Sequence, residues 1–274
     1  MKHVTISILI LLVSFSSYAQ NKIRGSRNVV VETREALPFN RLIVSSDIDV
    51  ILSQGHQVGL EVEADDNLIE SIYTEVKDSV LEIHLLDDVT RSKALKVHVS
   101  VNSPIFILET RDKSNVSGAS TLVFEEFYLL AQNHSSINLN INAPYVDMKF
   151  YDKSKNDVIL SNNELAKVYA EGSSSVDLNL TSQELKASLQ GSSDIKLTGN
   201  AITLELSSLE KSDFEAKEFV VEDATLNTSD HADVSVNVSK KLTISAQQNS
   251  EIDIYGNPSY DILLFTDKAT LNKK

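Results

Sequence analysis

Five carboxylates recur at regular intervals through the second half of the 274-residue chain: Asp157, Asp194, Asp213, Asp233 and Glu251. Each directly precedes an apolar residue that follows a short polar turn. If equivalent residues stack, neighbouring carboxylates about 5 Å apart repel by roughly 0.8 kcal/mol per pair in water. A calcium ion could relieve that repulsion, so these residues are weak candidates for metal ligands. We favour a solvated outer corner, because Asp is common in turns and Gly-rich calcium-binding nonapeptides are absent.

Other side chains give no recognisable catalytic constellation. The chain has no Cys, which excludes thiol nucleophiles, disulfides and Cys-ligated zinc. His134 precedes Ser135 and Asp230 precedes His231, but adjacency in sequence does not make a catalytic triad, and neither an HExxH nor a GxSxG motif is present. We predict no catalytic residues, no cofactor and no required metal.

The charge balance excludes one class of partner. The sequence contains 25 Lys plus Arg against 39 Asp plus Glu, a formal net charge of −14. Its last Arg is Arg111. Without a basic stripe to contact phosphates along a strand, we expect no nucleic-acid binding.

An internal repeat must position the recurring side chains. The apolar residues that follow the turns are 18 to 21 positions apart: Val116, Ile137, Val158, Val176, Ile195, Phe214, Val234, Ile252 and Leu271. The residue eight places before each of them is apolar in every repeat. The residue two places before is small or short and polar, as in Ser114, Asn156 and Ser174.

This spacing predicts the fold. Apolar residues two apart, such as Leu204 and Leu206, indicate β-strands, and no helical spacing persists. A unit of this length fits one coil of a parallel β-solenoid, in which each side chain lies about 4.8 Å above its equivalent. A β-sandwich is the alternative, but it gives no reason for matched columns across many units. We predict an all-β, single-stranded parallel β-solenoid with a dry interior and an inner Ser ladder.

We divide the mature chain into two continuous parts. Residues 105–274 are predicted to form the solenoid of about nine coils. Residues 20–104 are predicted to form an N-terminal β-rich cap, with a first coil at Ser45–Leu52. Asp65 and Asp66 are placed to cap a short helix within it. Such a cap would cover the open backbone edge at one end of the solenoid.

Residues 1–19 are predicted to be a secretory signal peptide. Val4–Phe15 is an apolar stretch of twelve residues, and Ser17 and Ala19 are small residues at the −3 and −1 positions of a cleavage site. Twelve residues are too few to cross about 30 Å of hydrocarbon at 1.5 Å per residue. We expect an exported protein without a transmembrane segment, in the periplasm, associated with the outer membrane, or extracellular.

Three segments resemble a known family. They are Phe39–Gly55 (FNRLIVSSDIDVILSQG), Leu60–Leu85 and Ser103–Ser120. They are similar to the "putative autotransporter-adhesin head GIN domain" family of secreted Bacteroidota proteins. The resemblance implies a right-handed parallel β-helix and an envelope location, and it brings no established catalytic residues.

Two functions remain open at this point. The first is a non-enzymatic, adhesin-like binding or structural module whose repetitive face contacts an envelope protein or a glycan. The second is a polysaccharide lyase or hydrolase, which needs a carboxylate pair or a Lys or Arg base beside a positive anchor. No such group stands out. A homo-oligomer could form through sheet edges at the sparsely capped end near Asp261 to Leu271.

Overall fold

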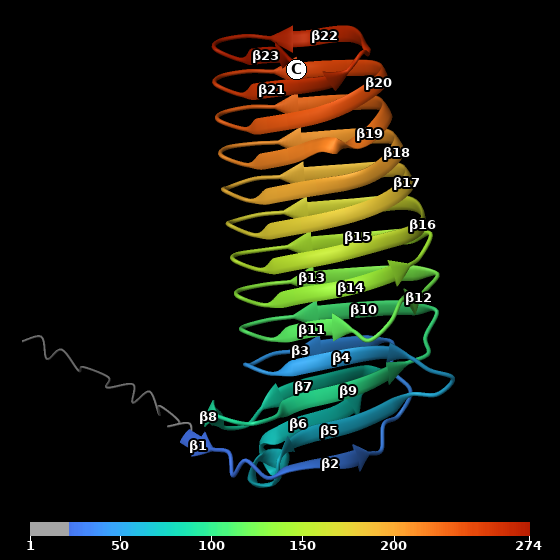
Figure 1. The fold of residues 1–274 in the computed structure, drawn as a ribbon, viewed down its shortest axis with the longest axis vertical. Coiled ribbons are helices and arrows are strands. Elements are labelled where there is room, and N and C mark those ends of the chain that lie inside the picture. Colours follow the sequence, from blue (N-terminus) through green and yellow to red (C-terminus); the bar gives the residue numbers. More distant parts are fainter. Residues whose placement is uncertain (1–21) are drawn as a thin grey trace, which may run out of the picture.

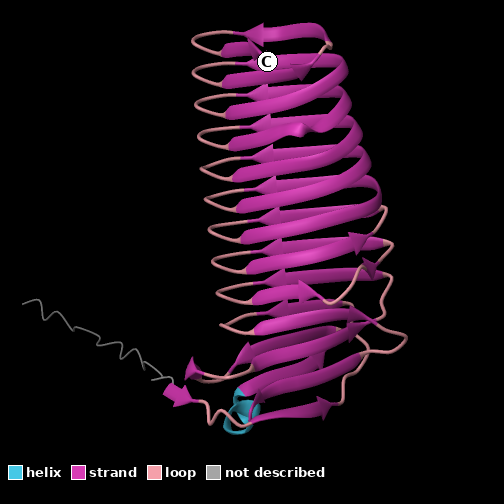
Figure 2. Ribbon diagram, viewed as in Figure 1, coloured by secondary structure: helices cyan, strands magenta, loops and turns pink. Residues whose placement is uncertain are grey.

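The structure, a computed structural model, describes residues 22–274 and consists almost entirely of β-strands (Figure 2). Its described part contains one helix, the 3₁₀ helix η1 (Asp66–Ser71). The predicted all-β solenoid is confirmed. The predicted signal peptide lies outside the described residues. No helix within residues 22–274 combines the length and hydrophobicity needed to cross a membrane.

Parallel coils of two strands each stack into a solenoid of about nine turns (Figure 1). In one coil, β10 (Ile105–Thr110) leads through a tight turn to β11 (Asn115–Gly118). The next coil places β13 (Glu126–Ala131) beside β10 and β14 (Ser136–Asn142) beside β11, both in parallel. The solenoid therefore has two outer faces. We name them the first-strand face, which contains β10 and β13, and the second-strand face, which contains β11 and β14.

The later coils are more regular than the early ones. From β16 (Lys155–Ala170) to β20 (Asp233–Ala246), one continuous strand supplies the second strand of a coil and the first strand of the next. The other strands of this region are β12 (Leu122–Val123), β15 (Tyr145–Phe150), β17 (Ser175–Leu189), β18 (Asp194–Ser208), β19 (Asp213–Thr228), β21 (Glu251–Gly256), β22 (Ser259–Phe265) and β23 (Thr270–Lys273).

Alternate residues of both faces point inward and form one continuous core. Leu204 and Leu206 are 2% and 1% exposed, whereas the intervening Glu205 is exposed. The Phe124 ring stacks between two others: its centroid lies 5.3 Å from that of Phe106 and 5.4 Å from that of Phe127. This burial of apolar side chains is the main stabilising contribution to the stack.

Each tight turn contains one residue in the left-handed region of backbone conformation. Its members in successive coils are Asp112, Asn133, Asp152, Gly172, Gly191, Glu210, Asp230, Gln248 and Asp267, with φ between 59° and 81°. Several of their side chains accept the backbone N–H of the preceding coil, as Asp152 Oδ2 does from Asn133 at 2.9 Å. A Cβ at Gly191 would lie 2.8 Å from the Gly172 carbonyl oxygen, so glycine suits this position where two turns approach closely.

The predicted Ser ladder lines the inner side of these turns. Ser114, Ser135, Ser174 and Ser193 are at most 1% exposed. Four hydroxyls of the ladder donate to the carbonyl three residues earlier: Ser114 to Arg111 O at 2.8 Å, and likewise Ser193, Ser212 and Ser250 at 2.7 to 3.0 Å. Small hydroxyl side chains thus satisfy turn carbonyls inside the core, which explains their repetition.

One repeat was predicted two residues out of register. Ile137 pairs with Asn156 rather than with Val158, and Asn156 pairs in turn with Val176. Ser154 therefore belongs to the Ser ladder, and Asn156 lies in an apolar column at 5% exposure. Because side chains alternate with a period of two, a two-residue shift leaves the inward and outward sets unchanged. The apolar pattern consequently fits both registers.

The N-terminal residues form a cap whose coils do not follow chain order. β3 (Arg41–Val44) and β4 (Asp49–Gln54) make one coil, and β7 (Val80–Leu85) and β9 (Leu95–Val101) pair with them in parallel on the side away from β10. Three antiparallel strands close this end: β2 (Val29–Arg34), β5 (Gly59–Asp65) and β6 (Ile72–Lys77). β1 (Lys22–Arg24) and β8 (Asp88–Arg91) form a separate two-stranded sheet beside the cap.

Asp65 has a different role from the predicted one. The short helix is present, but the Asp65 side chain makes no capping hydrogen bond to it. The carboxylate is fully buried and accepts the backbone N–H groups of Arg27 at 2.9 Å and of Lys93 and Ala94 at 3.1 to 3.2 Å. It therefore joins the loop before β2 to the loop before β9.

Candidate functional site

Four of the five predicted carboxylates form an unbroken acidic column on the second-strand face. Asp194, Asp213, Asp233 and Glu251 are register partners in β18 to β21. The inclusion of Asp157 was wrong. Lys155 pairs with Ser175 at this position, and Asp157 lies in the neighbouring column beside Asp177. This error has the same cause as the shifted repeat.

Stacking disfavours ionisation at the centre of the acidic column. Loss of hydration raises the pKa of Asp213, and the negative charge of Asp233 raises it further. Loss of hydration and the charge of Glu251 likewise raise the pKa of Asp233. The column supplies one carboxylate per coil in a line, whereas a calcium site needs six to eight oxygens around one point. Within residues 22–274, no group of three or more His, Asp or Glu side chains is arranged to hold a metal ion.

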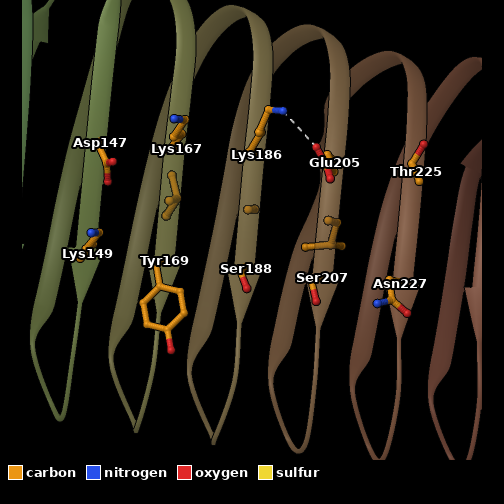
Figure 3. Close-up of a pocket in the computed structure, with 13 residues that line it drawn as sticks. Asp147, Lys149, Lys167, Tyr169, Lys186, Ser188, Glu205, Ser207, Thr225 and Asn227 are labelled. Atoms are coloured by element: carbon orange, nitrogen blue, oxygen red, sulfur yellow. Dashed lines mark ion pairs between the residues drawn. The ribbon is translucent and has the colours of Figure 1, made fainter.

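A hollow of about 410 Å³ crosses the first-strand face over β15 to β19 (Figure 3). We name it the groove. It is lined by Asp147, Lys149, Lys167, Val168, Tyr169, Lys186, Ala187, Ser188, Glu205, Leu206, Ser207, Thr225 and Asn227. Most of these side chains belong to two outward columns, with one residue from each coil, so the stacking of the coils fixes their spacing.

Two small side chains open the groove. Tyr169, Ser188, Ser207 and Asn227 are successive register partners in one outward column. Because the serines are small, they leave space in the groove between the Tyr169 ring and the Asn227 amide (Figure 3). The groove therefore combines an aromatic ring with hydroxyl and amide groups that can both donate and accept hydrogen bonds.

The second column contributes two lysines whose amines are held by neighbouring side chains. Lys186 Nζ lies 3.1 Å from Glu184 Oε1 and 3.2 Å from Glu205 Oε2, and these contacts raise the pKa of Lys186. Lys167 Nζ donates to the Tyr145 hydroxyl at 3.2 Å and lies 5.5 Å from that ring centroid. Both amines are thus held in defined positions.

Tyr169 is fixed by its neighbours in the adjacent turn. Its hydroxyl donates to Glu171 Oε2 at 2.8 Å. Partial burial, together with this bond, raises the pKa of Tyr169 to about 12. The Tyr151 ring packs against it at 5.6 Å between centroids. The exposed part of the ring is therefore a neutral, positioned surface.

The sequence analysis did not identify the groove. Its only signal is a local change of size within one outward column, from tyrosine to two serines. That change becomes visible only once the register of the coils is known, and the shifted repeat at Val158 lies immediately before these coils. The inward columns could be predicted because their residues are apolar. The residues of outward columns face solvent and are not restricted to one type, so their columns could not be predicted.

The stacked register and the outward columns place the protein among parallel β-solenoids with a polar, repeated surface. The family model described as "Putative auto-transporter adhesin, head GIN domain" matches residues 38–161 and 154–258. The chain therefore belongs to this family, as the resemblance in its sequence predicted. None of the curated proteins matches the chain.

Three solved structures from Parabacteroides share the fold at 17% sequence identity, and each is covered completely by 93% of this chain. They are a "putative adhesin" from Parabacteroides distasonis with a TM-score of 0.68, a "Putative lipid binding protein" from the same species with 0.65, and a "putative adhesin" from Parabacteroides merdae with 0.64. At this identity the likeness concerns the fold alone.

Proposed function

We propose that the protein is an exported, non-enzymatic binding module whose groove on the first-strand face holds a glycan chain. The groove carries this proposal. It joins one half-buried aromatic ring to several hydroxyl, amide and amine groups at fixed spacing, which is the composition of a site that orients a polar ligand. Membership in a family described as adhesins supports binding as the general role.

A glycan suits the groove better than a protein surface does. Stable protein interfaces bury about 800 Å² on each partner and use clustered Trp, Tyr and Arg residues. The groove contains one Tyr and no Trp or Arg. Its three lysines face two carboxylates, so its local charge is nearly balanced although the whole chain is at −14. A neutral, hydroxyl-rich ligand matches that balance.

The groups in the groove are poorly suited to sugar cleavage. Asp147 and Glu205 are separated by three coils, or roughly 14 Å at about 4.8 Å per coil, whereas glycosidase carboxylates lie about 5 to 9.5 Å apart. A lyase needs a deprotonated base, but Lys186 and Tyr169 both have raised pKa values. Each therefore holds its proton at neutral pH. These features favour binding over the lyase or hydrolase alternative.

A polysaccharide screen with matched variants tests the proposal. Purified protein is assayed against bacterial and host polysaccharides for retention and for release of reducing or unsaturated ends. We expect retention without cleavage. Ser207→Phe, which fills the groove, should weaken binding by about tenfold or more. Ser235→Phe places the same ring on the second-strand face and should leave the affinity unchanged.

Two results would contradict the proposal. Release of cleaved sugar by the wild-type protein, lost in Ser207→Phe, would replace the binding module with an enzyme. Equal glycan affinity in the two Phe variants would remove the groove as the binding site.

A further inference from the structure

The arginines of this acidic chain divide into two sets. Arg34, Arg41 and Arg111 each pair with a glutamate. The other three, Arg24, Arg27 and Arg91, make no ion pair with any carboxylate of residues 22–274. They line one hollow of about 260 Å³ beside the cap, together with Gly25 and Ser92. In a chain with net charge −14, such a concentration of unneutralised positive charge requires an explanation.

Two of these arginines lie opposite each other in strand register. Arg24 of β1 pairs with Arg91 of β8 in the separate two-stranded sheet. Like charges that face each other across strands are destabilising. A two-stranded sheet has little other stability to offset this repulsion. The arrangement is favourable when an anion lies between the guanidinium groups.

The third arginine is held in an uncommon backbone conformation. Arg27 has φ of 71°, in the left-handed region that a long side chain seldom adopts. Such residues persist where the surroundings fix them, and they concentrate at ligand-binding positions. Here the Arg27 N–H is held by the fully buried Asp65 carboxylate at 2.9 Å. Arg27 is thus fixed in its backbone at a position that lines the hollow.

Hydrogen bonds connect β1 and the loop after it to β8 and to the 3₁₀ helix. Asn67 Nδ2 donates to the Arg24 carbonyl at 2.9 Å, and Asn67 Oδ1 accepts the Ser26 N–H at 2.7 Å. The Gly25 N–H donates to the Arg91 carbonyl at 2.7 Å. Asp65 lies directly behind Gly25, since a Cβ there would be 2.0 Å from Asp65 Oδ2. The carboxylate of Asp65 accepts backbone N–H groups and makes no ion pair with these arginines.

We propose that Arg24, Arg27 and Arg91 form a binding site for a phosphoryl group. Guanidinium groups bind phosphate through paired, charge-assisted hydrogen bonds, and three of them match a doubly charged oxyanion better than a single carboxylate. The phosphoryl group could belong to a lipid headgroup or to a soluble or saccharide-bound phosphate. This site is separate from the groove and does not depend on the function proposed for it.

Calorimetry with inorganic phosphate tests the site, at constant ionic strength set with chloride. We expect saturable binding with one phosphate per chain. The double variant Arg24→Gln with Arg91→Gln should weaken it at least tenfold. Arg27→Gly suits the local φ, so it should keep the fold while also weakening phosphate binding. Lys93→Gln, which removes a neighbouring positive charge outside the hollow, should change the affinity by less than about twofold.

Vesicles distinguish the two sources of the phosphoryl group. Sedimentation with phosphatidate in phosphatidylcholine vesicles, lost in the double variant, would assign a lipid headgroup. Phosphate binding without vesicle binding would assign a soluble or saccharide phosphate. The proposal is overturned if the wild-type protein binds neither probe, or if the arginine variants bind both as well as the wild type does.

Discussion

Arg41 Nη2 lies 2.7 Å from Glu109 Oε2, although the two residues are 68 positions apart in sequence. Arg41 belongs to β3 and Glu109 to β10, so this ion pair connects the first coil to the next across the whole excursion of residues 55–104. The Glu109 side chain is only 4% exposed. Burial acts to raise the pKa of Glu109, but hydrogen bonds from Arg41 and Arg111 together hold it below its usual range.

We predict that Arg41→Met destabilises the protein by about 1 to 3 kcal/mol, because it leaves a buried carboxylate with one of its two cationic partners. Since the folded pKa of Glu109 is lowered, the stabilisation exists above the unfolded pKa near 4.3 and disappears as pH falls through the folded value. Urea unfolding at pH 7 and at pH 3 measures both effects. The control Lys240→Met breaks an exposed pair with Glu222 and should have a clearly smaller effect, because water screens exposed pairs. Equal losses in the two variants would contradict the prediction.

The acidic column should have the opposite pH dependence. The folded pKa of Asp213 is raised, so the native state binds more protons than the unfolded state, and stability falls as pH rises from about 3.9 through the folded value. Asp213→Asn should therefore increase the melting temperature at pH 7 and have little effect below pH 3.5. Asp223→Asn, beside Lys241 in its column, should not increase it. A melting temperature that drops in Asp213→Asn at pH 7 would refute this account.

Calcium should have little effect on stability. The acidic column offers carboxylates in a line on an exposed face, so we expect millimolar calcium to leave the melting temperature nearly unchanged, while added salt raises it slightly by screening. Differential scanning fluorimetry with and without chelator measures the change. A saturable calcium heat that disappears in the double variant Asp194→Asn with Asp213→Asn would show that the column binds the ion.

Asn156 should be replaceable by an apolar residue with a gain in stability. Its Oδ1 atom is buried and accepts no hydrogen bond from the described residues, while its Nδ2 donates to Ser154 Oγ and to Ser175 O, both at 3.1 Å. Its column neighbours are the apolar Ile137 and Val176. Asn156→Val restores the apolar column and should stabilise the protein by about 1 kcal/mol, as measured by thermal unfolding. Asn163→Val is the contrasting change, because both polar atoms of the Asn163 amide are hydrogen-bonded: Nδ2 donates to Ala143 O, and Oδ1 accepts from Ser182 Oγ. That variant should be destabilised, and a similar response of both variants would count against the argument.

Much of the fold was predictable because its dominant signal is local and repeated. Inward residues such as Leu204 and Leu206 alternate in every coil, and the Ser ladder marks each turn. The register between coils was harder to predict, because shifting a strand by two residues leaves the same side chains buried. This ambiguity caused the wrong column assignments of Val158 and Asp157. The site was hardest. Tyr169 and Ser207 are 38 positions apart, and nothing in an outward column constrains which side chains become neighbours until the coils are stacked. Arg24 and Arg91 meet only through the unusual path of the cap.

That path has a consequence for how the chain folds. The coil of β3 and β4 comes first in the sequence of the stacked coils, yet it lies between two later pairs of strands. β7 and β9 flank it on one side, and β10 and β11 flank it on the other. Both flanking pairs can form only when long segments of chain have closed into loops. Loop closure costs conformational entropy before the native contacts can offset that cost. From β10 onward, each coil needs only about twenty residues to pair with the coil that precedes it. Closure of the cap should therefore be slower than the addition of a regular coil.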